Sequence, residues 1–276
     1  MRRRVRFEES IDWHVFNRGS RRMALFRDDQ DARVFAALLQ TGLEVSGCVL
    51  WAYVLMTNHF HLAIRGSSAQ LRRCMHYVEW LYSLYHNKRY GLSGAAFEGR
   101  YEAYPQGTLP MLLRTIAYVL MNPVAAGLVE SPDAYSWSNY GAFFGGTPSL
   151  LSGDADLFLD RFDPDPSLSQ ARLLTFMDRE RARILRGDHR PGMSAKDVQA
   201  NHFDWLLEEA STRKAITEVF NPLTLALYWA KEAGFHRGAI HRVLGGPMSS
   251  HQRNQLSRLR RWLSDDPARA ELAALP

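Results

Sequence analysis

The stretch Tyr53–Ile64, with the sequence YVLMTNHFHLAI, decides the fold of this chain. Two apolar runs flank a central Thr-Asn pair of the kind that turns a chain, so the stretch predicts two antiparallel strands joined in a hairpin. Successive side chains of a strand point to opposite faces. His59 and His61 are therefore expected to share one face. Phe60 and Leu62 are expected on the other face, where they can reach a core.

The spacing of these two histidines suggests a metal site. Two imidazoles that lie two residues apart on a rigid strand can both bind one divalent ion. His59 and His61 are thus candidate metal ligands. The alternative is a chance occurrence, because the chain contains 10 histidines among 276 residues. A second stretch further along the chain adds weight to the metal site.

That second stretch is Tyr118–Val129, YVLMNPVAAGLV. Apolar spacing predicts an amphipathic helix over Leu109–Met121, and Pro123 marks its expected end. Tyr118 and Asn122 are four residues apart, so both should point the same way from the last turn. The alternatives are a core tyrosine with a hydrogen-bonded hydroxyl and an asparagine that caps the helix.

Taken together, the two stretches resemble a known family. The segment His59-Phe60-His61 resembles the His-hydrophobic-His signature of the HUH single-strand nucleases. Its combination with Tyr118, Asn122 and the following Pro-Val-x-Ala-Gly resembles the REP-associated tyrosine transposases, relatives of the single-tyrosine insertion-sequence transposases. The segments WHVFNRG, FEGRY and YSWSNY also match in the expected order. The resemblance covers roughly residues 5–145.

This resemblance implies a single-stranded DNA endonuclease and strand transferase that acts on repeat or hairpin DNA. Tyr118 would be the catalytic nucleophile and would form a 5′-phosphotyrosine bond to DNA, leaving a free 3′-hydroxyl. The metal ligands would be His59, His61 and Asn122, and the cofactor Mg²⁺ or Mn²⁺. Some relatives have glutamine at the position of Asn122, so its role as a ligand stays open.

Two other functions also stay open. One is a non-catalytic DNA-binding regulator built on the same domain, although intact His59, His61 and Tyr118 speak against it. The other is a metal-dependent nuclease that uses water, in which Tyr118 is structural. A covalent adduct between protein and DNA separates the transferase from both alternatives.

The charge balance permits a polyanionic partner without proving one. The formal net charge is +5, from 34 basic and 29 acidic residues. Arg18, Arg21 and Arg22 form a basic turn after a strand predicted over Ile11–Asn17, and an adjacent glycine lets backbone approach a phosphate. The alternative is a solvated surface turn. Arg100 is a further candidate for DNA contact.

Cysteine usage and hydropathy suggest a cytoplasmic protein without a membrane partner. Cys48 and Cys74 fit no zinc or redox spacing, and we expect buried thiols in a reducing compartment. No apolar region typical of a signal peptide follows the basic N-terminus, and no apolar run is long enough to span a bilayer.

The order of the predicted elements indicates an α+β fold. Helices are predicted over Asp28–Glu44 and Ala69–Tyr90, and a short strand over Phe97–Pro105. The order strand, helix, strand, strand, helix, strand, helix predicts a ferredoxin-like antiparallel sheet with helices on one face. The resemblance implies the same core, with the histidine strand central and the Tyr118 helix packed beside it.

Composition divides the chain into two domains. A catalytic domain is predicted over residues 1–146, a linker rich in turn residues over 147–169, and an all-α domain over 170–276. The helices expected in the C-terminal domain are Gln170–Arg186, Ser194–Glu209, Thr212–Val219, Leu223–Ala233, His236–Leu244 and Ser249–Leu263.

The last helices of this domain predict a helix-turn-helix within about residues 223–263. The second helix of the motif, Ser249–Leu263, would be the recognition helix and would present Arg253 and Arg258 to DNA. The alternative is a small helical bundle with a solvated basic face.

Overall fold

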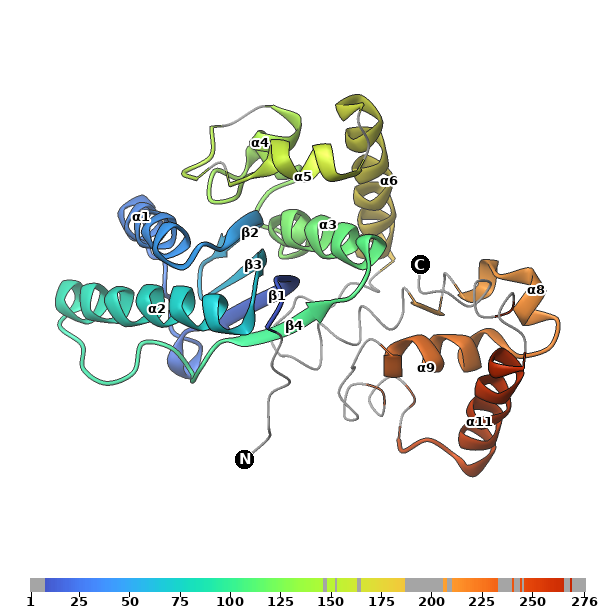
Figure 1. Cartoon of the computed structure of the whole chain (residues 1–276). Coiled ribbons are helices and arrows are strands. Elements are labelled where there is room, and N and C mark those ends of the chain that lie inside the picture. Colours follow the sequence, from blue (N-terminus) through green and yellow to red (C-terminus); the bar gives the residue numbers. More distant parts are fainter. Residues whose placement is uncertain are drawn as a thin grey trace. The chain divides into compact units, whose positions relative to one another are not determined.

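The structure is a computed structural model that describes residues 8–145, 148–151, 153–162, 165–186, 206–207, 210–232, 240, 244, 246–265 and 269. The chain divides into two compact units. The first comprises residues 1–107 and 112–186, and the second comprises residues 108–111 and 187–276. The first unit contains the sheet, shown with its helices in Figure 1.

Four antiparallel strands form this sheet in the order β2-β3-β1-β4. Their bounds are β1 Ile11–Arg18, β2 Val49–Met56, β3 His59–Gly66 and β4 Glu102–Gln106. The hairpin predicted around Thr57-Asn58 is confirmed. The strand predicted over Phe97–Pro105 is shorter than expected, because residues before Glu102 form a loop that meets β1 only through an isolated bridge from Phe97 to Gly19.

Two long helices connect the strands. Helix α1 (Asp29–Ser46) joins β1 to β2, and α2 (Ser68–Tyr90) joins β3 to β4. With this element order and this strand order, the sheet has the ferredoxin-like arrangement. Asp28 caps α1 by accepting hydrogen bonds from two backbone amides, and Ser67 forms a capping box with Gln70 at the start of α2.

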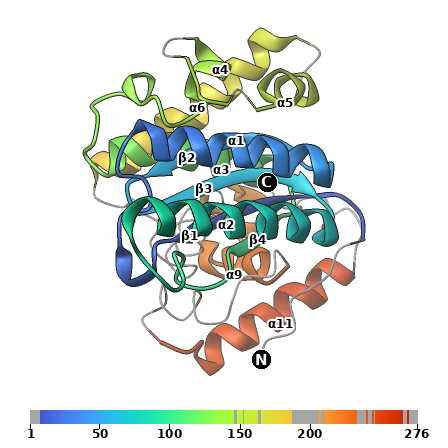
Figure 2. The same ribbon diagram turned by 90° about the vertical axis from the view of Figure 1, so that its left-hand side faces the viewer.

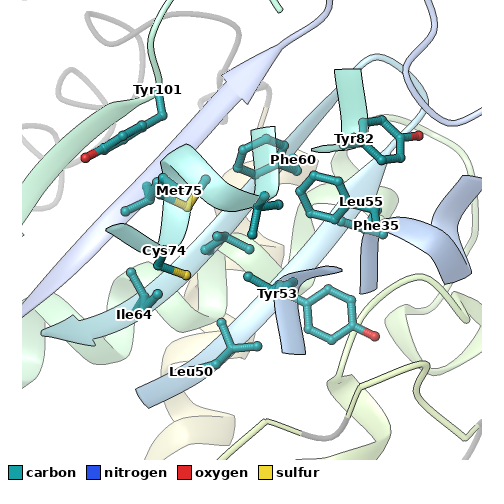
Figure 3. Packing of buried hydrophobic residues seen from close by; sticks show 14 of the residues in the cluster. Phe35, Leu50, Tyr53, Leu55, Phe60, Ile64, Cys74, Met75, Tyr82 and Tyr101 are labelled. Atoms are coloured by element: carbon teal, nitrogen blue, oxygen red, sulfur yellow. The ribbon is translucent and has the colours of Figure 1, made fainter. Parts of the chain in front are cut away.

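The core lies between the sheet and these two helices, which stand in front of the strands in Figure 2. Phe60 extends from β3 to Phe35 of α1, with ring centroids 5.0 Å apart, and Phe35 meets Tyr82 of α2 at 5.1 Å. Figure 3 shows these rings packed together with aliphatic side chains of β2 and β3. The alternation predicted for β3 is confirmed, because Phe60 and Leu62 are fully buried in this core.

Helix α3 (Leu109–Ala125) corrects two expectations. It lies across the sheet from α1 and α2, so the helices do not all cover one face (Figure 1). It also continues through Pro123 instead of ending at Met121. The amide of Ala126 donates to the carbonyl of Asn122, and the chain turns at Gly127, whose φ is +67°. The last turn therefore survives the loss of one amide donor at the proline.

Trp137, Asn139 and Asp154 lie along the outer side of β2. The amide of Leu55 donates to Trp137 O at 2.8 Å, and the amide of Tyr53 donates to Asn139 Oδ1 at 2.8 Å. Further along the strand, the amide of Asp154 donates to Leu50 O at 2.7 Å, and the amide of Leu50 donates to Asp154 Oδ2 at 3.0 Å. The backbone groups of β2 that face away from β3 are thus hydrogen-bonded.

The segment predicted as a linker, 147–169, contains regular structure. It holds α5 (Ala155–Phe162) and the first turn of α6 (Pro166–Leu185), which covers the helix predicted over Gln170–Arg186. Phe158 of α5 packs on Trp51 of β2, with ring centroids 5.6 Å apart. The compact units divide between residues 186 and 187, beyond the boundary suggested by composition. The turn-forming residues of the predicted linker therefore separate α5 from its neighbouring helices within one unit.

The remaining elements range from single 3₁₀ turns to the 15 residues of α11. They are η1 (Ser20–Arg22), η2 (Pro132–Ala134), α4 (Tyr140–Phe144), α8 (Lys214–Thr217), α9 (Pro222–Glu232) and α11 (Ser250–Ser264).

Helices α9 and α11 match two predicted helices, and α8 covers only part of the one predicted over Thr212–Val219. Within the second unit α9 and α11 pack against each other. The helices predicted over Ser194–Glu209 and His236–Leu244 lie mostly outside the described residues. The helix-turn-helix accordingly stays a prediction.

Two simpler expectations concern cysteines and membranes. Cys48 and Cys74 are free and buried, as the sequence predicts. Within the described part of the chain, no helix combines the length and the apolar character needed to cross a bilayer.

Candidate functional site

His59 and His61 occupy the face of β3 that points away from the core. Their ring centroids are 5.1 Å apart, and both side chains are buried. His59 is also held from the hairpin turn, because its Nδ1 lies 2.8 Å from Asn58 Oδ1. The strand thus places the two imidazoles side by side, as its alternation predicts.

Tyr118 comes to these histidines from α3. Its ring centroid lies 5.5 Å from that of His61, in an edge-to-face arrangement, and its side chain is only 1% exposed. The apolar stripe of α3 explains why Tyr118 lies here, since Leu112, Ile116 and Leu120 on the same helix are also buried. The structure therefore brings together Tyr118, His59 and His61 from two separate sequence motifs.

His14 of β1 is a third imidazole in the site, and sequence reasoning did not select it. His14 Nε2 lies 3.1 Å from His61 Nδ1, and its ring lies 5.6 Å from Tyr118. The strand register places Phe16 opposite His61, so His14 is the diagonal neighbour of His61. The signal available in the sequence was the alternation of β1, which gives His14 and Phe16 one face.

Burial among apolar and aromatic side chains keeps the imidazoles of His14 and His59 neutral. The Phe16 ring lies 5.4 Å from His61 and 5.5 Å from His14. Burial lowers the pKa of His14 to about 3. Burial, together with the positive charge of Arg18, lowers the pKa of His59 to about 4. Neutral rings retain the nitrogen lone pairs that a metal ion requires.

Asn122, the predicted third metal ligand, is buried on α3 one turn beyond Tyr118. Its Nδ2 donates a hydrogen bond to the carbonyl of Tyr118 at 2.9 Å. The alternative reading, a cap at the end of the helix, is wrong because α3 continues to Ala125. In the described part of the chain, no three side chains among His, Cys, Asp and Glu are placed to hold a metal ion. A metal at His59 and His61 therefore needs other donors.

Four of the predicted DNA-binding arginines lie around the end of β1. Arg18 pairs in register with His59 and forms an ion pair with Glu98. Arg21 and Arg22 are exposed and adopt left-handed backbone conformations, with φ of 54° and 61°. Arg100 is exposed on the loop that bridges to this end of β1. Two adjacent non-glycine residues at positive φ are costly, which marks the turn as a strained segment.

Arg253 and Arg258 are exposed on α11, whose apolar residues Leu256, Leu259 and Leu263 are buried. The helix begins at a capping box formed by Ser249 and Gln252. Both arginines belong to the second unit.

The buried histidines predict a loss of stability in acid. In the unfolded chain an imidazole titrates near pH 6.5, whereas in the fold the pKa of His14 is about 3. Below pH 6.5 the unfolded state binds the extra proton, so stability falls as the pH falls. Each such histidine should cost about 1.4 kcal/mol per pH unit in this range.

Urea unfolding of metal-free protein between pH 7.5 and 5 measures this dependence. His14→Gln should reduce its steepness by the contribution of one histidine. An unchanged steepness in the variant would mean that His14 is protonated as readily in the fold as in the unfolded chain.

Comparison with known proteins gives one similar structure. It is a solved structure of a REP-associated tyrosine transposase bound to a REP hairpin, with 15% sequence identity and a TM-score of 0.43. The match covers 56% of this chain and 93% of that chain. No protein-family model and no curated protein matches the sequence.

Proposed function

We propose that this protein cuts and rejoins single-stranded DNA, with Tyr118 as the nucleophile. The observation that carries the proposal is the position of the phenol, whose ring lies 5.5 Å from His61 and 5.6 Å from His14. A tyrosine hydroxyl becomes a useful nucleophile when neighbouring groups accept its proton or bind the charge that develops. The resemblance of the two sequence motifs supports the same role for Tyr118.

The donor set of His59 and His61 fits a divalent metal ion. His59 Nε2 is buried and has no hydrogen-bond partner among the described residues, which is unfavourable unless a ligand occupies it. A bound ion would neutralise the negative charge that develops on the scissile phosphate. Imidazole is a frequent ligand of transition metals, whereas Mg²⁺ prefers oxygen, so we favour Mn²⁺ over Mg²⁺.

The proposed reaction conserves one phosphoester bond. Tyr118 Oη loses its proton and bonds to phosphorus, while the bond from phosphorus to the 3′-oxygen breaks. The 3′-oxygen takes up a proton and leaves as a hydroxyl. In the reverse direction the 3′-hydroxyl of another strand attacks the phosphotyrosine, and Tyr118 recovers its proton. Strands can therefore be rejoined without an external energy source.

Access to this site requires a conformational change. Tyr118 is 1% exposed and His61 is fully buried, so the folded arrangement leaves no room for a DNA strand. A phosphate must reach Tyr118 Oη, so the groups that cover the phenol must move before cleavage.

The arginines at the end of β1 and on α11 are proposed to bind the DNA backbone. Arg18, Arg21, Arg22 and Arg100 surround the end of β1 beside His59, where a strand entering the site would pass. Arg253 and Arg258 offer a second basic surface on α11. The motif resemblance implies repeat or hairpin DNA as the substrate. Phosphate contacts of this kind supply affinity and strong salt dependence.

A first prediction tests the nucleophile. Tyr118→Phe removes only the hydroxyl, so the protein should fold and bind single-stranded DNA but form no covalent adduct. The measurement is a denaturing gel of protein incubated with labelled single-stranded repeat DNA and Mn²⁺. The matched control is Tyr104→Phe, because Tyr104 stacks on Phe16 near the same face, and this variant should still form the adduct. Adduct formation by the Tyr118→Phe protein would refute the assignment.

The metal role of Asn122 is tested by titrating cleavage against Mn²⁺. If Asn122 Oδ1 is a ligand, Asn122→Ala should raise the concentration for half-maximal cleavage by about tenfold or more. Asn122→Asp keeps an oxygen donor and should stay close to the wild type. If the side chain only binds the Tyr118 carbonyl, Asn122→Ala should lower stability by about 1 kcal/mol and leave the midpoint unmoved.

For the arginines the decisive quantity is the salt dependence of DNA binding. Arg253→Ala combined with Arg258→Ala should weaken binding to single strands and reduce the slope of log K against log salt by about 0.7 for each lost phosphate contact. Arg33→Ala on α1 is the control, because its partner is Asp29 on the same helix. An unaltered slope in the double variant would exclude α11 from the DNA-binding surface.

A further inference from the structure

His14 and His61 share one hydrogen bond inside the site. Their nitrogens, His14 Nε2 and His61 Nδ1, are 3.1 Å apart, and both side chains are fully buried. In this hydrogen bond one nitrogen carries the hydrogen and the other accepts it. The direction of this bond decides which nitrogen of His61 keeps its lone pair.

The hydrogen bond between His59 Nδ1 and Asn58 Oδ1 can run in only one direction. Asn58 Nδ2 donates to the carbonyl of Arg22 at 3.5 Å, so the amide turns its oxygen toward His59. A carbonyl oxygen can only accept, and His59 Nδ1 therefore carries the hydrogen. The lone pair of His59 is left on Nε2, the buried atom that lacks a hydrogen-bond partner among the described residues.

For His61 the nitrogen toward His14 is again Nδ1, so only Nε2 remains to bind a metal beside His59. We propose that His14 is a positioning residue that accepts the hydrogen of His61 Nδ1 and thereby holds the His61 Nε2 lone pair ready for the ion. This inference rests on the proposed function, in which His59 and His61 bind the metal. His14 itself touches neither metal nor DNA in this scheme.

The packing around His14 suits such a role. Its ring contacts those of Phe16, at 5.5 Å, and Tyr118, at 5.6 Å, so the imidazole is packed against two aromatic neighbours. A group that hydrogen-bonds to the free ring nitrogen of a metal-binding histidine fixes its tautomer and typically contributes 10- to 100-fold in metal affinity. On a strand face lined by Phe16, an aliphatic residue would fill the same volume without accepting a hydrogen bond.

The test compares two substitutions in the full-length protein. His14→Gln places an amide oxygen that can accept from His61 Nδ1, whereas His14→Leu cannot accept. Mn²⁺ affinity measured by isothermal titration calorimetry should fall 10- to 100-fold in His14→Leu and recover most of that loss in His14→Gln. Phe16→Leu is the packing control on the same strand face and should bind Mn²⁺ nearly as tightly as the wild type.

A second readout needs no metal. Long-range ¹H–¹⁵N correlation spectra of the metal-free wild-type protein should show the hydrogen of His61 on Nδ1, and the spectrum of His14→Gln should show the same. A hydrogen on His61 Nε2 in the wild type overturns the inference, whether or not the His14→Leu protein folds.

The outcomes separate the two proposals. Wild-type protein that binds Mn²⁺ with an affinity equal to that of His14→Leu refutes the role of His14 and leaves the proposed function standing. Wild-type protein that binds Mn²⁺ no better than His61→Ala refutes the metal site, and the role of His14 falls with it.

Discussion

Strand β3 is buried on both faces, and its side chains alternate between two environments that must not be exchanged. Phe60 and Leu62 enter the core formed with α1 and α2, while His59 and His61 enter a second layer beneath α3. A slip of one residue in register would put both imidazoles into the apolar core and two large apolar side chains beside Tyr118. The imidazoles would lose the partners they have here, Asn58 and His14, which makes this exchange costly. The same pattern therefore fixes the register of the sheet and the composition of the site.

Local patterns predicted the parts of this arrangement that depend on neighbours in sequence. The hairpin, α1 and α2 follow from periodicity and from their end residues, including Asp28 and Gly91. Local rules were less successful at Pro123, because α3 continues to Ala125 although the proline lacks an amide donor. Turn-rich composition between residues 147 and 169 likewise concealed α5, whose Phe158 packs on Trp51.

The site shows the same division between local and long-range information. Two sequence motifs named His59, His61 and Tyr118, and the fold brings these side chains together. His14 could not be assigned to the site from β1 alone, because its neighbours depend on the pairing that sets Phe16 opposite His61. Strand pairing over such a distance in sequence is a property of the whole sheet, and alternation within one strand cannot supply it. The contact of Asn58 with His59 was also missed, since a turn residue was considered only for its backbone.

The hydrogen bonds that Trp137, Asn139 and Asp154 make along β2 have a consequence for association between molecules. An exposed edge strand is a template on which another chain can add a strand, and proteins commonly block it. Here Trp137, Asn139 and Asp154 occupy the outward amides and carbonyls of β2. At the opposite edge, β4 has only five residues and includes Pro105, which lacks an amide hydrogen. Sheet extension and strand-mediated aggregation are thereby discouraged at both edges, and a second protein molecule would have to meet this unit through helices or loops.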